Sequence, residues 1–165
     1  MKRYILILLL VVAGGGFYYY QMPAKHFDIE GVSFTLIDGR RLSMAQLRGQ
    51  PVLVTFWATS CVMCIKEIPD LIKLYKKYTP KGLKIIAVAM PYDRPDHVVE
   101  MVKLKNLPYP VALDIDAQIV RSFNNVRVTP NHFLIAPDGS IIKHQIGILD
   151  LSKTEKLLLK YFNGT

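Results

Sequence analysis

The chain has 165 residues, a formal net charge of +8 and two cysteines. Beyond an apolar N-terminal stretch, about 140 residues remain, a common size for a single hydrophobic core. The positive charge does not indicate a nucleic-acid-binding protein, because the basic residues are scattered and no strand or helix interleaves them with aromatic side chains. A solvated basic surface is the simpler interpretation, and the sequence shows no internal repeat and no low-complexity tract.

The N-terminal segment predicts a membrane anchor. Lys2 and Arg3 precede an uncharged stretch over residues 4–22, which as a helix would be about 28 Å long, close to a bilayer core of roughly 30 Å. The two positive charges favour an orientation in which the rest of the chain is exported. A cleaved signal peptide is the alternative, because residues 13–15 are small and offer a cleavage point. The aromatic run 17–20 resembles an interfacial belt and favours retention.

We therefore predict a signal anchor or transmembrane segment over residues 1–25 and one folded domain over residues 26–165. The domain is expected on the periplasmic, extracytoplasmic side of the cytoplasmic membrane. Such a compartment is oxidising and favours disulfides over free thiols, which bears on the two cysteines of the chain.

Within the domain, short apolar runs alternate with amphipathic segments. The predicted strands cover residues 34–36, 41–42, 52–57, 83–90, 111–113, 131–135 and 141–144, and the predicted helices cover residues 62–78, 95–106, 117–123 and 152–162. A Pro137-Asp138-Gly139 turn joins the last two strands into an antiparallel hairpin. A parallel strand–helix–strand part followed by a hairpin indicates an α/β fold with a central mixed sheet flanked by helices.

Cys61 and Cys64 stand where the strand 52–57 runs into the helix 62–78. Cys61 is expected at the helix N-terminus, where unpaired N–H groups and the positive end of the helix dipole stabilise a thiolate. A helical wheel places Cys64 in the apolar arc, so Cys64 is expected to be buried while Cys61 is exposed. This arrangement predicts dithiol–disulfide exchange, in which Cys61 forms a mixed disulfide that Cys64 then displaces.

Three other roles remain open for the cysteine pair. A structural disulfide between residues this close would constrain the unfolded chain little. A structural zinc site would need two further Cys or His ligands at suitable spacing, and the sequence has no second cysteine pair. A Cu(I) site is chemically compatible, since two thiolates and an imidazole suit a soft ion and the chain has four histidines.

Several motifs around the cysteines resemble those of one protein family. Phe56-Trp57-Ala58 leads to the CxxC pair, and Val128-Thr129-Pro130 precedes an apolar strand and the hairpin. Further marks are Phe34-Thr35-Leu36, Leu47-Arg48-Gly49-Gln50-Pro51 and Cys64-Ile65-Lys66-Glu67-Ile68-Pro69. From Phe27 to the C-terminus, the chain resembles the thioredoxin fold and, more narrowly, the membrane-anchored TlpA/ResA-like thiol–disulfide oxidoreductases.

The resemblance implies a client-binding site beside the dithiol. Pro130 matches the family's cis-proline loop, in which the backbone of Thr129 would pair with an extended client peptide. The alternative is an ordinary trans proline in a turn. Trp57 and Ser60, on the approach to the first cysteine, are also expected to contribute to client binding.

The resemblance also implies an acid–base role for Glu67, which matches a helix glutamate near the cysteines and could shuttle the proton of Cys64. The helical wheel agrees, because it places Glu67 beside Leu74 and Tyr78 rather than among the lysines. Thioredoxin itself has a buried aspartate at the position of Thr55, so Glu67 would inherit the role of that base. A salt bridge with a lysine is the alternative.

The sequence departs from the family pattern at several positions. Ser60 stands where a tryptophan is common, and the dipeptide Val62-Met63 lacks the proline or acidic residue that many relatives carry. His132 replaces a frequent threonine, and we expect it to be a satisfied histidine of an edge strand, with thiolate stabilisation or copper ligation as alternatives. Ala58 replaces the threonine that a peroxidatic site requires, which argues against a peroxiredoxin.

These observations predict a monomeric protein-disulfide reductase that needs no metal and no cofactor other than the Cys61–Cys64 disulfide. The family suggests exported thiol-containing clients, such as cytochrome c haem-attachment cysteines or the copper-site cysteines of an oxidase. A transmembrane thiol reductant would supply the electrons. The alternatives are a copper chaperone that uses Cys61, Cys64 and His132 as ligands, and a general disulfide oxidase or isomerase.

Overall fold

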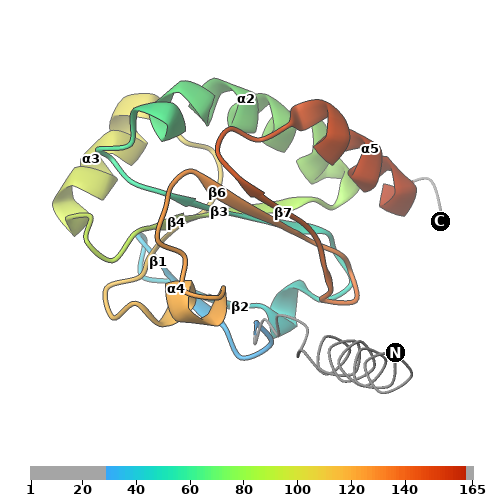
Figure 1. Ribbon diagram of the computed structural model, residues 1–165, viewed down its shortest axis with the longest axis horizontal. Helices are drawn as coiled ribbons and strands as arrows, with labels where there is room; N and C mark the ends of the chain where they lie inside the picture. The colour runs from blue at the N-terminus through green and yellow to red at the C-terminus, as the bar shows by residue number, and fades with distance from the viewer. Residues whose placement is uncertain (1–28, 163–165) are drawn as a thin grey trace, which may run out of the picture.

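A computed structural model describes residues 29–162 of the chain (Figure 1). The strands are β1 (Ser33–Leu36), β2 (Arg41–Ser43), β3 (Val52–Trp57), β4 (Lys84–Ala89), β5 (Val111–Leu113), β6 (Asn131–Ile135) and β7 (Ile141–Ile146). The helices are α2 (Val62–Tyr78), α3 (Pro95–Lys105), α4 (Gln118–Ser122) and α5 (Leu151–Phe162), with short 3-10 helices η1 (Ala45–Leu47) and η2 (Thr79–Lys81). The predicted strands and helices are confirmed, with ends that differ by at most two residues.

The predicted anchor over residues 1–25 lies outside the described residues. Within 29–162, the structure has no helix that is long and apolar enough to cross a membrane.

One mixed sheet, in the order β2-β1-β5-β4-β3-β6-β7, forms the centre of the domain. β3 and β4 are parallel, and so are β4 and β5, whereas β6 runs antiparallel to both β3 and β7. The expected parallel part with an added hairpin is therefore confirmed. The antiparallel pairing of β1 with β5 was not predicted from the sequence; it adds β1 and β2 to the sheet beyond β5, at the edge opposite β7.

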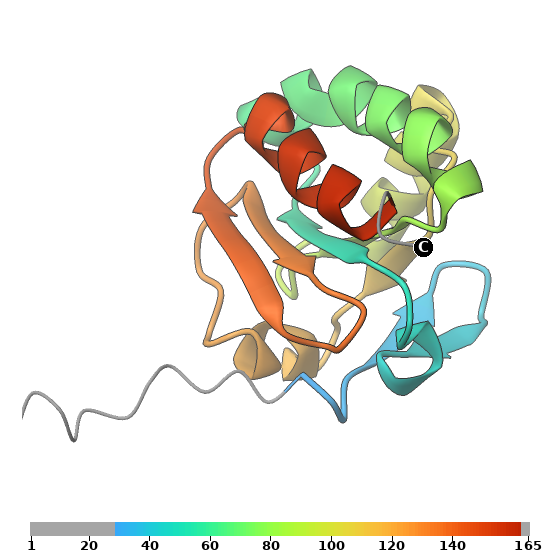
Figure 2. The same ribbon diagram turned by 90° about the vertical axis from the view of Figure 1, so that its right-hand side faces the viewer.

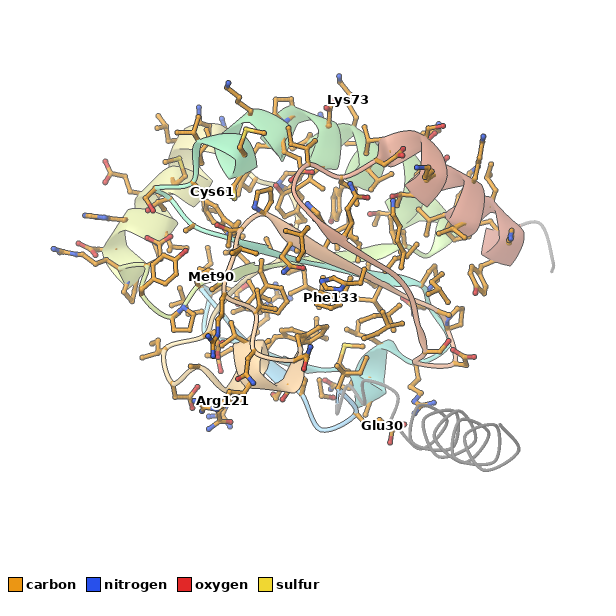
Figure 3. The ribbon with its side chains drawn as sticks, viewed as in Figure 1. Glu30, Cys61, Lys73, Met90, Arg121 and Phe133 are labelled. Carbon is orange, nitrogen blue, oxygen red and sulfur yellow. A yellow bond between two sulfur atoms is a disulfide. The ribbon has the colours of Figure 1, made fainter. Side chains whose placement is uncertain are left out.

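Helices cover both faces of the sheet, as Figures 1 and 2 show. α2, α3 and α5 lie on one face, and the short α4 and η1 lie on the other. All six residues of β3 are buried, and they alternate between the two cores. Side chains fill the space on both sides of the sheet (Figure 3). Val54 and Phe56 pack on the α4 side, while Leu53 and Trp57 pack on the α2 side, which explains why this strand is apolar throughout.

The sheet brings three separate segments to one edge. The parallel strands β3 and β4 both end there, and β6 begins there because it runs antiparallel to β3, with Asn131 opposite Phe56. The residues that follow β3 lead to Cys61, and the residues that precede β6 are Thr129 and Pro130. The fold therefore places the CxxC pair and the proline loop at the same edge, although they are far apart in the sequence.

Candidate active site

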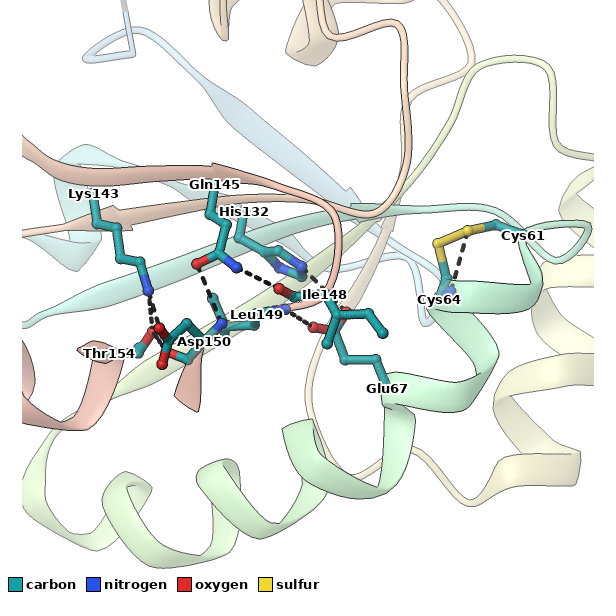
Figure 4. Close-up of polar contacts among 10 residues, drawn as sticks. All are labelled: Cys61, Cys64, Glu67, His132, Lys143, Gln145, Ile148, Leu149, Asp150 and Thr154. Atoms are coloured by element: carbon teal, nitrogen blue, oxygen red, sulfur yellow. Dashed lines mark hydrogen bonds and ion pairs between the residues drawn. A yellow bond between two sulfur atoms is a disulfide. The ribbon is translucent and has the colours of Figure 1, made fainter. Parts of the chain in front are cut away.

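Cys61 and Cys64 form a disulfide at the beginning of α2 (Figure 4). Cys61 is the N-cap residue, and its Sγ accepts a hydrogen bond from the N–H of Cys64 at 3.2 Å. Cys61 is half-buried, whereas Cys64 is 4% exposed. Cys64 is buried as expected, whereas Cys61, which was expected to be exposed, is more exposed than Cys64 but only half-buried.

An aspartate fixes the loop that leads to Cys61. The Asp93 carboxylate accepts hydrogen bonds from the N–H and the hydroxyl of Thr59, each at 2.6 Å. Asp93 follows β4, and β4 runs parallel to β3, so both loops leave the same edge of the sheet. Asp93 was not predicted from the sequence, although its place shortly after a buried parallel strand was a usable signal.

The Thr129–Pro130 peptide bond is cis, so the alternative of a trans turn proline is wrong. Pro130 is buried, and its carbonyl accepts a hydrogen bond from the N–H of Gly147 at 2.9 Å. Thr129 is half-buried and directly precedes this fixed residue. The residue that follows β7 thus fixes Pro130 in the loop, while the half-buried Thr129 keeps part of its surface exposed to solvent.

Trp57 and Ser60 differ in accessibility. Ser60 is exposed beside Cys61, so its side chain is available to a client. Trp57 is 5% exposed and lines a small cavity together with Cys64. The Trp57 side chain is therefore buried beside this cavity rather than on the outer surface.

Glu67 lies one turn after Cys64 on the buried side of α2, with 2% of its side chain exposed. Its Oε1 accepts a hydrogen bond from the N–H of Leu149. Its Oε2 lies 3.2 Å from Nε2 of His132 (Figure 4). The alternative of a salt bridge with a lysine is wrong, because the ion-pair partner of this carboxylate in the described chain is a histidine.

A cavity of about 10 Å³ joins Cys64 to Glu67. Its lining also includes Thr55, the position of the buried aspartate of thioredoxin, and Tyr109. Most of the lining is apolar, and the volume is at the lower limit for one water molecule. Burial, followed by the negative charge of Glu67, raises the pKa of the Tyr109 phenol above its ordinary range, as expected for a poorly hydrated region.

His132 is not a histidine of an edge strand, contrary to our expectation. It lies in β6, which is paired on both sides, and it is 1% exposed. Its ring faces Glu67 (Figure 4). In this disulfide form, the described residues contain no group of three His, Cys, Asp or Glu side chains arranged to hold a metal ion.

The segment between β7 and α5 supplies the Leu149 N–H that Glu67 binds. Gln145 holds this segment, because its Oε1 accepts from the N–H of Asp150 at 3.2 Å and its Nε2 donates to the carbonyl of Ile148. The Asp150 carboxylate accepts from the N–H of Lys153 at 3.0 Å, at the start of α5. The position of Leu149 thus depends on contacts that the sequence alone does not indicate.

We expect the contribution of Asp150 to stability to depend on pH. The hydrogen bond from the Lys153 N–H lowers the pKa of Asp150 in the folded state. The ionised side chain therefore stabilises the fold above about pH 4, the ordinary pKa of aspartate, and this stabilisation is lost as the pH falls through the lowered value. Asp150→Ala should lower the Tm, measured by circular dichroism, more at neutral pH than in acid. Asp150→Asn, which keeps a capping oxygen, is the control, and a pH-independent Tm difference would contradict the expectation.

A half-buried cysteine at a helix N-terminus, disulfide-bonded to a buried one beside a cis-proline loop, on a thioredoxin-like sheet, defines a thiol–disulfide oxidoreductase. The chain belongs to the Redoxin family, whose model matches residues 24–158.

Two curated relatives and one solved structure agree with this assignment. Thiol-disulfide oxidoreductase ResA of Bacillus thuringiensis subsp. konkukian is 34% identical over 127 residues, which is 76% of this chain and 72% of the relative. ResA of Bacillus subtilis is 32% identical over 133 residues, which is 79% of this chain and 71% of the relative. The solution structure of a putative thioredoxin from Neisseria meningitidis superimposes with a TM-score of 0.74 at 31% identity, covering 81% of this chain and 89% of that one.

Proposed function

We propose that this protein reduces disulfides in exported client proteins, with Cys61 as the attacking and Cys64 as the resolving sulfur. The accessible Cys61 beside the buried Cys64 carries this proposal. The Cys61 thiolate attacks a client disulfide and releases one client thiol. Cys64 then attacks Cys61 and releases the second client thiol, which leaves the disulfide described above. A transmembrane thiol reductant would restore the dithiol.

Exposed apolar side chains around the disulfide favour a protein client. They are Val62 and Met63 at the start of α2, Val128 before the proline loop, and Ile146 and Ile148 on either side of Gly147. Each is between 44% and 66% exposed. Apolar residues grouped in this way mark surfaces that bind proteins. We propose that Thr129 pairs with the extended backbone of the client, that Pro130 fixes this strand, and that Ser60 contacts the client beside Cys61.

We propose that Glu67 accepts the proton of Cys64 during the second step. A buried thiol needs a nearby base to become a nucleophile, and Cys64 and Glu67 line the same small cavity, one turn apart on α2. The carboxylate is held in place by the Leu149 N–H.

The proposed location is the outer face of the cytoplasmic membrane, with residues 1–25 as the anchor. The uncharged stretch over residues 4–22 and the preceding positive charges support this proposal. The clients would be thiol proteins assembled there, such as apocytochrome c or the copper-site protein of an oxidase. Alkaline phosphatase fused to the C-terminus of the full chain should be active and remain with the membrane fraction. An inactive fusion would contradict export, and an active fusion released from the membrane would indicate a cleaved signal peptide.

Reduction of a client disulfide tests the proposed chemistry. The reduced full-length chain, in detergent, should reduce an oxidised peptide that carries a CxxCH haem-attachment motif. Loss of this activity in Cys61→Ser at every pH, with no more than a changed pH dependence in His132→Gln, would support the reductase over a copper chaperone. The same variants should also be titrated with Cu(I). If the chain binds Cu(I) stoichiometrically, if this binding needs both cysteines and His132, and if the chain does not reduce the peptide, the result would favour the copper chaperone.

A further inference from the structure

His132 and Glu67 form an isolated pair of ionisable groups in the core. Nε2 of His132 lies 3.2 Å from Oε2 of Glu67, and the side chains are 1% and 2% exposed. This distance is within ion-pair range, but the ring N–H is not directed well enough for a hydrogen bond, so the contact is electrostatic. Nδ1 of His132 is also buried and has no hydrogen-bond partner among the described residues.

The surroundings offer these two groups no other counter-charge. The phenol of Tyr109 and the sulfur of Cys64 face Glu67 across the cavity, and both are uncharged in this form. Lys143, on β7, donates to the carbonyl of Asp150 and the hydroxyl of Thr154 instead. The side chains opposite His132 on the neighbouring strands are neutral, namely Thr55 on β3 and Gln145 on β7. No lysine or arginine in residues 29–162 forms an ion pair with Glu67.

Two buried groups this close do not titrate independently. With an ionised carboxylate and a neutral imidazole, the pair carries a charge of −1 in a region of low dielectric. One added proton removes the net charge, whether it resides on Glu67 or on His132. The proton therefore has two alternative sites, one on each residue of the pair.

We propose that His132 is a positioning residue that makes Glu67 and itself one buried acid–base pair, which holds the proton released by Cys64. The proposal rests on the roles proposed above for Cys64 and Glu67. His132 acts through Glu67 and does not touch the reacting sulfurs. It therefore sets the pH range in which the second step of exchange occurs.

The second step of exchange starts from the mixed disulfide between Cys61 and a client. The Cys64 thiol gives its proton to the pair, and the resulting thiolate attacks Sγ of Cys61. The Cys61–Cys64 bond forms, and the bond between Cys61 and the client sulfur breaks. The client sulfur leaves with the electron pair as a thiolate and takes a proton from solvent. When a reductant thiolate later attacks Cys61, Cys64 leaves as a thiolate and takes the proton back from the pair.

Ellman's disulfide, 5,5′-dithiobis(2-nitrobenzoate), separates the two steps. Attack by Cys61 on this reagent releases a first thionitrobenzoate, and attack by Cys64 on the mixed disulfide releases a second. Stopped-flow absorbance gives both rates for the reduced full-length chain in detergent, from about pH 5 to about pH 9. We expect His132→Gln and His132→Thr to shift the pH midpoint of the second release down by about one unit, because the proton released by Cys64 then has one site instead of two. The pH profile of the first release should stay the same.

His144→Gln is the matched control, because His144 is on the adjacent strand, stacks on Phe133 and contacts Asn131 on the opposite face of the sheet. Its midpoint should equal that of the wild type. Glu67→Gln combined with His132→Gln should behave as Glu67→Gln alone, since the pair no longer exists in either. An unchanged or raised midpoint in both folded His132 variants would overturn the inference. Absence of a second release from the wild type would instead refute the proposed function.

Discussion

Replacing Cys64 with serine is expected to trap clients as stable mixed disulfides on Cys61. Cys61 remains at the start of α2, half-buried and able to attack, but nothing is left to displace the client. Turnover should fall by about three orders of magnitude or more, because the variant stops after one reaction. Acid quenching followed by non-reducing mass spectrometry should detect one adduct per chain.

Cys61→Ser provides the control for this experiment. Cys64 is 4% exposed and cannot meet a folded client, so this variant should form no adduct. Adducts in equal amounts on both variants would show that burial does not distinguish the two sulfurs. An absence of adducts from Cys64→Ser would refute the assignment of Cys61 as the attacking residue.

Glu67→Gln is expected to slow the attack of Cys64 on the mixed disulfide by about a hundredfold near neutral pH. The amide keeps the shape of the side chain and an oxygen for the Leu149 N–H, so the segment before α5 should stay in place. It cannot accept a proton from Cys64. The rate of the second thionitrobenzoate release, measured against pH, checks this expectation, while the first release should be nearly unaffected.

Glu100→Gln serves as the matched control, since Glu100 is exposed on α3 and should leave both rates unchanged. If Glu67→Gln has the rates and pH profile of the wild type, Glu67 has only a structural role. A slower first release would indicate instead that the variant disturbs the N-terminus of α2 and the reactivity of Cys61.

Local periodicity was sufficient to predict α2 and the environment of its side chains. The helix has the predicted bounds, Val62–Tyr78, and Cys64 is buried as the helical wheel indicated. Glu67, which the wheel placed away from the lysines, is buried as well. This succeeds because the apolar residues of α2 repeat with the helical period, so the face that meets the sheet can be read from the sequence. The cis bond before Pro130 was expected from the family resemblance, not from periodicity.

The partners of Glu67 could not be predicted, because they depend on tertiary packing. His132 was expected at an edge, but β7 pairs with the outer side of β6 and makes it an interior strand. The register that places His132 opposite Thr55 then points the imidazole toward α2. The N–H of Leu149 comes from a segment whose position is fixed by Gln145, and no local pattern in the sequence indicates that contact.

The reduction potential of the Cys61–Cys64 pair tests most directly whether this protein donates electrons to its clients. It can be measured by equilibrating the full-length chain with dithiothreitol and glutathione buffers and quantifying the dithiol by alkylation. We predict a value at or below about −250 mV, in the range of thioredoxin-like reductants that depend on an electron supply. A value near −120 mV would make the protein an oxidant and would contradict the proposed direction of exchange.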